Sequence, residues 1–359
     1  MRGANGDVAQ IRVGLIGCGR VAWERHLPAL RHVPGLRVTA VADVDGKRLS
    51  RQTSLYSIPH AFTDYRALID SREVDAVGVL TPTASHCEIG LASMEAGKPL
   101  LLEKPLALTL EEGRRLVEAA RRAPAACVLC FNLRWHRLIR EARELLRGGL
   151  LGSVAAIRSA YLHNRDGAKA PDWHRRLALG GGVSFNEAVH HFDLWRYLLG
   201  VEIREVFSWH LSTEHFEDET STITARLGSG ALASGVFSFR SSPNSEVEIL
   251  GEKGRLLIGL YRFDGLEFYP SGVYPGDIGD RLRRGLRAVS GIPRMLSVMR
   301  QGGEFQATFV GVWRHFRDCV ARGIASECRF EDGQKTLEAA LAAVESARTG
   351  RAVAVGSGL

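Results

Sequence analysis

The chain of 359 residues is long enough for about two domains, and its 45% hydrophobic and 24% charged residues are typical of a globular enzyme. This composition excludes a disordered chain and a fibrous repeat. The longest apolar runs, such as 74–80, have the length of strands and are too short to cross a bilayer. The polar N-terminus contains no signal-peptide region, so the sequence predicts a cytoplasmic protein without a transmembrane segment or lipid anchor.

The formal charge of +7 comes mainly from one segment, Arg281–Arg300, which holds six arginines and no acid. Without those arginines the charge would fall to +1. Such a segment can attract a phosphate, an acidic partner or anionic lipid, and a solvated helical face is the simpler alternative. Without interleaved aromatic residues it gives no basis for nucleic-acid binding.

Six cysteines are spread over the chain without the spacing of a disulfide framework. Cys127 and Cys130 form one CxxC pair inside the apolar run 125–131. With no second pair of cysteines or histidines nearby, the pair is better interpreted as strand cysteines than as a zinc or redox site. We therefore predict no metal.

The first part of the chain alternates short apolar runs with helix-length amphipathic segments, a pattern typical of βαβ units. It predicts strands at 11–16, 36–42, 74–80, 99–102 and 126–131. It predicts helices at 21–32, 65–69, 87–96 and 110–122, and Thr109 with Glu112 forms a capping box for the last of these. Residues 11–131 are thus predicted to form a Rossmann domain with a doubly wound parallel sheet.

Beyond a helix at 138–147 and a glycine-rich break, strand follows strand. The pattern predicts strands at 154–162, 203–211, 220–227, 232–239, 247–250 and 255–260, with helices at 186–199, 305–321 and 334–349. Successive strands joined by short turns indicate an antiparallel sheet. Residues 132–355 are predicted to form an α+β domain with a large open, mainly antiparallel sheet, which binds substrate and mediates oligomerisation.

A glycine motif directly follows the first predicted strand and opens the first helix. Gly17 permits a tight turn, Gly19 lets a pyrophosphate approach the backbone, and Ala22 allows close packing of the helix. Arg20 and Val21 lie where the helix begins, so their backbone is expected near the phosphates. The context of strand, turn and helix predicts a dinucleotide site.

An acidic residue ends the second predicted strand. The carboxylate of Asp43 can accept hydrogen bonds from the ribose hydroxyls and would repel a 2′-phosphate, which favours NAD over NADP. Lys47 and Arg48 lie just downstream and keep NADP as the second interpretation.

Further motifs follow in a fixed order: His26-Leu27-Pro28-Ala29-Leu30, Thr81-Pro82 with His86, Gly97-Lys98-Pro99, Glu103-Lys104-Pro105, Gly180-Gly181-Gly182, and His190 with Asp193. With these motifs the chain resembles the Gfo/Idh/MocA family of nicotinamide-dependent oxidoreductases over about residues 11–355. The resemblance adds Thr81, Pro82, His86, Glu103 and Lys104 to the expected cofactor-binding residues. It also implies that Pro105 follows a cis peptide bond.

The resemblance implies that Lys104 contacts both the substrate oxygen and the nicotinamide ribose, and that His190 is the general base. Asn186 lies four residues before His190 on the same helical face. The family frequently has aspartate at this position. An asparagine can orient a hydroxyl but cannot take up a proton, so the proton chemistry is expected of His190 and Lys104.

Other polar side chains are candidates for the substrate site by position alone. Asn132 and Arg134 follow the last strand of the first domain, and Trp173 precedes the triple glycine. Ordinary packing is an equal alternative for each of them. With these candidates included, the residues expected to contact the substrate are Lys104, Asn132, Arg134, Trp173, Asn186 and His190.

Together these features predict an NAD-dependent dehydrogenase that acts on a secondary alcohol of a sugar, an inositol or a nucleotide sugar. Two alternatives stay open. One is a non-catalytic regulatory protein that binds the dinucleotide, and the other is an enzyme that uses tightly bound NAD for transient redox in elimination or glycoside cleavage. The resemblance also implies a homodimer or homotetramer formed through the open sheet.

Overall fold

The computed structural model describes residues 10–273 and 302–356, together with residues 278, 279, 282, 285, 286, 289, 298 and 299. The chain forms two compact units. The first consists of the chain up to Phe131 together with Phe309–Gly333, and the second of Asn132–Thr308 and the residues from Gln334 onward. The six arginines of Arg281–Arg300 lie outside the described residues. Among the residues described, no helix is long and apolar enough to cross a membrane.

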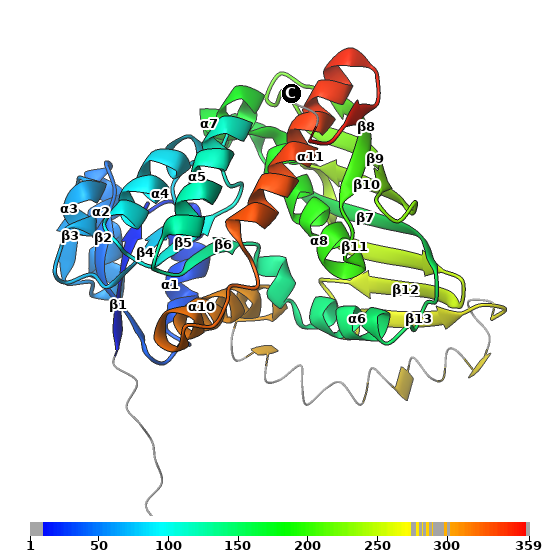
Figure 1. Cartoon of the computed structure of the whole chain (residues 1–359), viewed down its shortest axis with the longest axis horizontal. Helices are drawn as coiled ribbons and strands as arrows, with labels where there is room; N and C mark the ends of the chain where they lie inside the picture. The colour runs from blue at the N-terminus through cyan, green and yellow to red at the C-terminus, as the bar shows by residue number, and fades with distance from the viewer. Residues whose placement is uncertain are drawn as a thin grey trace, which may run out of the picture. The chain divides into compact units, whose positions relative to one another are not determined.

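The first unit is built on a six-stranded parallel sheet (Figure 1). Its strands are β1 (Ile11–Ile16), β2 (Leu36–Ala42), β3 (His60–Phe62), β4 (Ala76–Val79), β5 (Leu100–Glu103) and β6 (Cys127–Cys130), in the order β3-β2-β1-β4-β5-β6. The predicted Rossmann sheet is confirmed. The side chains of β5 are buried because helices cover both faces of such a sheet, and this explains its uninterrupted apolar sequence.

The helices of the first unit connect its strands. They are a π-helical turn (Ala22–His26) continued by α1 (Leu27–Leu30), then α2 (Gly46–Tyr56), α3 (Tyr65–Ile69), α4 (His86–Glu95) and α5 (Leu110–Arg122). The Thr109 capping box is present as predicted. The sequence pattern missed α2, which buries only Leu49 and Gln52, and the three-residue β3. The Asp45 side chain caps α2, and an aspartate before a polar helix was the one available signal.

Helix α10 (Glu304–Arg322) brings a late part of the chain into the first unit. A side chain at Gly78 of β4 would come within 2.9 Å of the Trp313 ring, so the glycine allows the indole to pack on the sheet. Sequence order had placed this segment in the second domain. It belongs to the first unit because buried side chains of α10 complete that unit's core.

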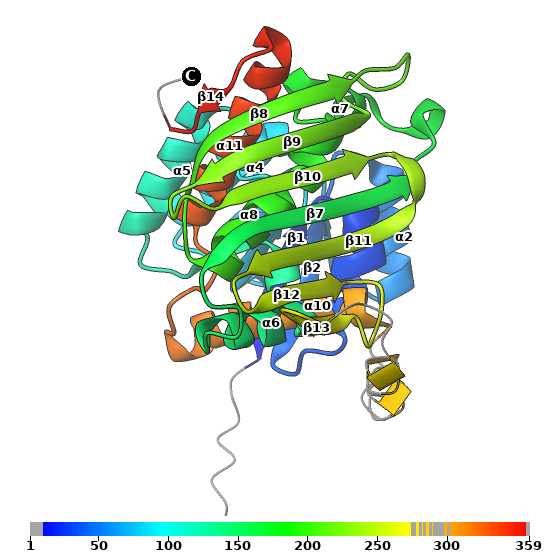
Figure 2. The same ribbon diagram turned by 90° about the vertical axis from the view of Figure 1, so that its right-hand side faces the viewer.

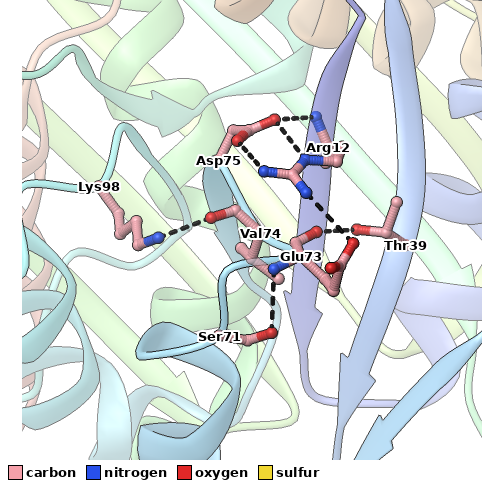
Figure 3. Close-up of polar contacts among 7 residues, drawn as sticks. All are labelled: Arg12, Thr39, Ser71, Glu73, Val74, Asp75 and Lys98. Carbon is pink, nitrogen blue, oxygen red and sulfur yellow. Dashed lines mark hydrogen bonds and ion pairs between the residues drawn. The ribbon is translucent and has the colours of Figure 1, made fainter.

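A polar cluster joins the amino ends of the strands in the same sheet (Figure 3). Arg12 on β1 forms a paired contact with the Asp75 carboxylate, at 3.0 and 2.8 Å, and also reaches Glu73. The Thr39 hydroxyl donates to the Glu73 carbonyl, and the Lys98 ammonium donates to the Val74 carbonyl at 2.6 Å. Ligands of open α/β sheets bind at the carboxyl edge, so this cluster has a structural role.

The second unit contains an eight-stranded sheet, in the order β13-β12-β11-β7-β10-β9-β8-β14. Its strands are β7 (Val154–Asn164), β8 (Ile203–Leu211), β9 (Thr220–Leu227), β10 (Leu232–Ser238), β11 (Arg240–Gly251), β12 (Gly254–Gly259), β13 (Leu266–Pro270) and β14 (Val353–Ala354). All neighbours are antiparallel except β7 and β10. The mainly antiparallel sheet is confirmed, although β13 and β14 were missed.

One face of this sheet carries helices, and no helix of the described residues covers the other, open face (Figure 2). The helices are α6 (Arg137–Arg147), α7 (Asp172–Arg175), α8 (Val189–Leu199), which continues a π-helical turn at Ser184–Ala188, and α11 (Phe330–Thr349). Helices α6, α8 and α11 lie behind the sheet in Figure 2. In β9 the open face is polar or charged while the covered face is apolar or small, the alternation typical of a sheet with one buried face.

Candidate active site

The glycine turn after β1 has the shape that a dinucleotide phosphate requires. Gly17 has a φ of +99°, and a Cβ there would come within 2.8 Å of the Leu80 carbonyl group. A Cβ at Gly19 would meet no atom within 4 Å. The first glycine is therefore required by the fold, whereas the second leaves open space beside the backbone, as the approach of a pyrophosphate demands.

Asp43 lies beside this turn and is held by two backbone contacts. One carboxylate oxygen accepts the Cys18 N–H at 2.7 Å, and the other accepts the Asp45 N–H at 2.8 Å. The fixed negative charge suits ribose hydroxyls and opposes a 2′-phosphate. Arg48, a cation that could favour NADP, forms an ion pair with Asp45 at 3.2 Å.

The loops after β4 and β5 are joined by a buried histidine. The His86 Nε2 lies 2.9 Å from the Thr81 carbonyl, and its Nδ1 lies 2.8 Å from the Pro105 carbonyl. Burial lowers the pKa of His86, and the contacts with the two carbonyls offset only part of this shift. Since a neutral imidazole carries one N–H, His86 donates to one of these carbonyls and lies against the other at the carboxyl edge of the sheet.

Lys104 follows β5 at this edge, and the Lys104–Pro105 peptide bond is cis, which confirms the expectation. Its backbone N–H donates to the Glu103 carboxylate at 3.0 Å. The other Glu103 oxygen lies 2.8 Å from His26 Nε2, and the Trp313 indole donates to His26 Nδ1 at 3.1 Å. Sequence reasoning did not assign roles to His26 or Trp313. Burial raises the pKa of Glu103, but the His26 and Cys130 hydrogen bonds and the Lys104 charge outweigh it and hold the pKa below its ordinary value.

His26, Glu103 and Cys130 bring three potential metal ligands within 4.8 Å of one another. An indole N–H can only donate, so the contact with Trp313 leaves the lone pair on His26 Nδ1 and the proton on Nε2. A protonated Nε2 cannot bind a metal, and it is already bonded to Glu103. The group is a hydrogen-bonded cluster in this arrangement.

The CxxC cysteines lie on β6, with Cys130 buried and Cys127 half-buried, and both thiols are free. Burial raises the pKa of the Cys127 thiol to about 12, and it raises that of Cys130 well above its ordinary value. Thiols of this kind are poor nucleophiles, which agrees with their interpretation as strand cysteines.

The second unit positions Asn186 and His190 one helical turn apart. Asn186 lies in the π-helical turn, and His190 lies in α8. The Asn186 amide donates to the Gly182 carbonyl at 2.8 Å and to the Gly180 carbonyl at 3.4 Å. An aspartate could make neither contact, so the asparagine suits the glycine loop of this chain.

The glycine loop before this helix is closely packed. A Cβ at Gly181 would come within 2.6 Å of the His174 backbone, and one at Gly182 within 2.7 Å of the Asp218 side chain. The buried Asp218 carboxylate accepts the Ser184 N–H at 2.9 Å, where the helix begins. The triple glycine and Asp218 thus set the start of the helix that carries Asn186 and His190.

Several other predicted site residues have structural partners within the second unit. Arg134 and Asp193 form a buried ion pair with Nε 2.7 Å from Oδ2, and the Asn132 amide donates to the Thr308 hydroxyl at 2.8 Å. These contacts favour the packing alternative for Asn132 and Arg134. Trp173 is half-buried, with its ring 5.0 Å from that of His174.

A polar cluster surrounds Glu187, the residue after Asn186, and of its members the sequence suggests only His163 as a candidate for the substrate site. Arg165 lies 2.6 Å from His174 Nε2 and 3.7 Å from the Glu187 carboxylate, and His163 lies 3.6 Å from the same carboxylate. A charged residue at position 187, inside an apolar helical run, was the available signal. His191 is fully buried and packs near the rings of Tyr161 and Phe237, so its role is structural.

A glycine turn and an acid after β2, at the carboxyl edge of a six-stranded parallel sheet, define a dinucleotide-binding protein of the Rossmann type, with Lys104 at the same edge. Comparisons with known proteins agree. Residues 11–131 match the model of an oxidoreductase family with an NAD-binding Rossmann fold, and residues 139–257 match that of the GFO/IDH/MocA C-terminal domain. The chain belongs to the Gfo/Idh/MocA family of oxidoreductases, and its cofactor is NAD.

Named relatives include dehydrogenases of cyclic polyols. Myo-inositol 2-dehydrogenase from Thermotoga maritima is 30% identical over 68% of this chain and 74% of its own length. The scyllo-inositol 2-dehydrogenase (NAD(+)) of Bacillus subtilis is 26% identical over 96% of each chain. A solved probable dehydrogenase from Thermotoga maritima superposes with a TM-score of 0.77 at 25% identity and covers 96% of this chain and 99% of its own.

Proposed function

We propose that the protein catalyses NAD-dependent hydride transfer at a secondary alcohol of a sugar or an inositol. The observation that carries this proposal is the carboxyl edge of the first unit's sheet. There the open turn at Gly19, the fixed carboxylate of Asp43 and the anchored backbone of Lys104 follow strands of one parallel sheet. Ligands of open α/β folds bind at that edge.

Each of three side chains has a distinct proposed role. Bound NAD would supply the hydride acceptor. His190 accepts the hydroxyl proton, and Lys104 donates a hydrogen bond to the oxygen as it becomes a carbonyl. Asn186 orients the hydroxyl or the imidazole, since its amide can hydrogen-bond but cannot take up a proton.

The relatives support a polyol as substrate. Besides the inositol dehydrogenases, they include a D-apiose dehydrogenase of Paraburkholderia graminis, 26% identical over 96% of this chain and 90% of its own length. The inositols and apiose that these names contain are polyols with hydroxyl groups on adjacent carbons.

A nucleotide sugar is the second candidate substrate. Its diphosphate could pair with the arginines of Arg281–Arg300, because guanidinium matches phosphate geometry. A dTDP-sugar 3-reductase of Streptomyces violaceoruber is also a relative, 28% identical over 70% of this chain. Replacing Arg283, Arg284 and Arg287 with glutamine should then raise KM for a nucleotide sugar and leave KM for inositols unchanged. Unchanged KM for both would eliminate this candidate, and binding of the wild type to anionic vesicles would assign the segment to lipid.

The deciding experiment follows nicotinamide absorbance while the enzyme is incubated with NAD and a panel of inositols, sugars and nucleotide sugars. Net reduction supports the proposal. Product without net reduction would identify transient redox, and binding without turnover would identify a regulatory protein.

Variants assign the roles. Lys104→Ala and His190→Ala should each lower kcat by about 100-fold or more, as expected when a group acting on the transferred proton is removed. Lys98→Ala is the matched control, because that ammonium is bonded at the amino edge of the sheet. Full turnover by either active-site variant would refute the assigned role.

A further inference from the structure

Three buried side chains of the first unit form one continuous hydrogen-bonded chain that ends at the backbone of Lys104. It runs from the Trp313 indole to His26 (3.1 Å), from His26 to Glu103 (2.8 Å), and from the second Glu103 oxygen to the Lys104 N–H (3.0 Å). Trp313 and His26 are fully buried, and Glu103 is 7% exposed. Such a chain has fixed geometry, since water does not compete for its contacts.

The donor and acceptor atoms of these residues allow the series of hydrogen bonds to run in only one direction. The Trp313 N–H has no acceptor capacity, so His26 Nδ1 must offer its lone pair and Nε2 must carry the proton. The Nε2–H then points a donor at the Glu103 carboxylate. Any other state of the ring would place two donors or two acceptors face to face. The aromatic rings of Phe309 and Trp313 lie edge-on to the imidazole, with centroids 5.0 and 5.8 Å away, and restrict its rotation.

The Glu103 carboxylate connects the fixed orientation of His26 to the backbone of Lys104. One Glu103 oxygen is held by His26, so the other is fixed where it accepts the Lys104 N–H. Loss of the His26 donor would leave a buried carboxylate oxygen without that partner, and the side chain would turn to find another. The Lys104 backbone N–H would then lose this hydrogen bond.

We propose that Trp313, His26 and Glu103 are positioning residues that set the backbone of Lys104 and thereby direct its ammonium during hydride transfer. This inference rests on the proposed function of Lys104. His26 touches neither substrate nor cofactor in this scheme and acts only through Lys104.

The test compares three variants. His26→Leu removes both contacts. His26→Gln restores them, because the oxygen and nitrogen of an amide have the same spacing as the two ring nitrogens. Trp313→Phe keeps an aromatic ring but removes the indole N–H, and it keeps the inference testable if His26→Leu fails to fold. His315→Leu is the matched control. This buried histidine lies on α10, as Trp313 does, and accepts the Glu327 N–H at 2.9 Å.

One readout needs no turnover. The chain has six lysines, so selective ¹⁵N-lysine labelling gives six backbone amide signals. His26→Leu and Trp313→Phe should shift the Lys104 amide signal and speed its hydrogen exchange, whereas His26→Gln and His315→Leu should leave it close to wild type. An unmoved Lys104 signal in a folded His26→Leu protein would overturn the inference.

The second readout is kinetic. His26→Leu should lower kcat by about 10- to 100-fold, as misplacement of a reacting group does, while the Kd for NADH stays within about threefold. In the Lys104→Ala background the same substitution should have no further effect on kcat. An equal loss in both backgrounds would indicate a general structural role and overturn the inference. Stoichiometric zinc in the purified protein would overturn it too, since it would make His26 a metal ligand.

The two proposals fail in different ways. If Lys104→Ala keeps full turnover, the proposed function of Lys104 fails and no kinetic effect of His26 is expected. If Lys104→Ala abolishes turnover while His26→Leu is fully active, only the positioning inference fails.

Discussion

Trp313 and His26 are separated by 287 residues in the sequence and share a hydrogen bond in the fold. The residues expected to bind the cofactor were found from local signals, because a glycine turn and a strand-end acid each occupy a few consecutive positions. Their supporting residues had no local signal. His26 lies in the predicted motif His26–Leu30, but only the fold reveals its partner.

The two glycines of the turn should respond differently to the same substitution. Gly19→Ala has open space around it, so the protein should fold normally, but the methyl group would occupy the phosphate's approach. Loss of phosphate hydrogen bonds costs about 1.5–3 kcal/mol, so the Kd for NADH should rise at least about tenfold. Isothermal calorimetry and thermal unfolding measure the two effects.

Gly17→Ala provides the contrast. A Cβ at Gly17 would strike the Leu80 carbonyl, and the φ of +99° is unfavourable for alanine. We expect a loss of stability of about 1–3 kcal/mol. A Gly19→Ala variant with unchanged NADH affinity would argue against phosphate binding at this turn.

Buried His191 should make the protein sensitive to mild acid. Burial lowers its pKa from 6.5 to about 3, so the folded state stays neutral at this ring while the unfolded chain binds a proton below about pH 6.5. Acidification from pH 6.5 towards 3 therefore favours unfolding, by about 2 kcal/mol at pH 5.

Urea unfolding of wild type and His191→Phe at pH 7.5 and pH 5 tests this. Phenylalanine preserves packing near Tyr161 and Phe237 and has no titratable group, so the variant should lose about 2 kcal/mol less on acidification. Equal losses in both proteins would show that His191 does not contribute.

At the scale of elements, patterns with a strong period were predicted well. Strands β1, β2, β8 and β9 begin and end where the sequence predicts. The elements that were missed or misplaced lack such a period. Helix α2 is mostly polar, β3 is short, and β11 begins with the mostly polar residues 240–245, which show no apolar alternation. Those polar residues pair irregularly with β7 around a register shift.

The polar cluster of Figure 3 should affect stability without affecting function. Arg12→Ala removes the paired contact that joins β1 to the residue before β4. Because the ion pair is partly exposed, the midpoint of thermal unfolding should fall only modestly. The Kd for NADH and kcat should be unchanged, since the cluster lies at the amino edge. Asp75→Asn should behave alike, and a large loss of NADH affinity in either variant would contradict this separation.

At the scale of the molecule, the open face of the second unit's sheet is the expected subunit interface. Trp209, Thr222 and Val236 lie in one row across β8, β9 and β10. Trp209 is 63% exposed and Val236 42%, and Leu232 of β10 is also exposed. Exposed apolar side chains grouped on a sheet are typical of association sites.

We expect the wild type to form a dimer or tetramer in solution. The double variant Trp209→Arg/Val236→Arg should dissociate into monomers in size-exclusion chromatography with light scattering, because charges on the face would be buried on association. Leu55→Arg, at an equally exposed apolar residue of α2, is the control. A monomeric wild type would refute the expectation.

The late entry of α10 into the first unit has a consequence during synthesis. Residues up to Phe131 leave the ribosome first, but the side chains that finish their core and anchor His26 belong to Phe309–Gly333. The core of the first unit therefore cannot be completed until nearly all of the polypeptide has been translated. A destabilising substitution in Phe309–Gly333 would therefore first impair the folding of the unit that binds NAD.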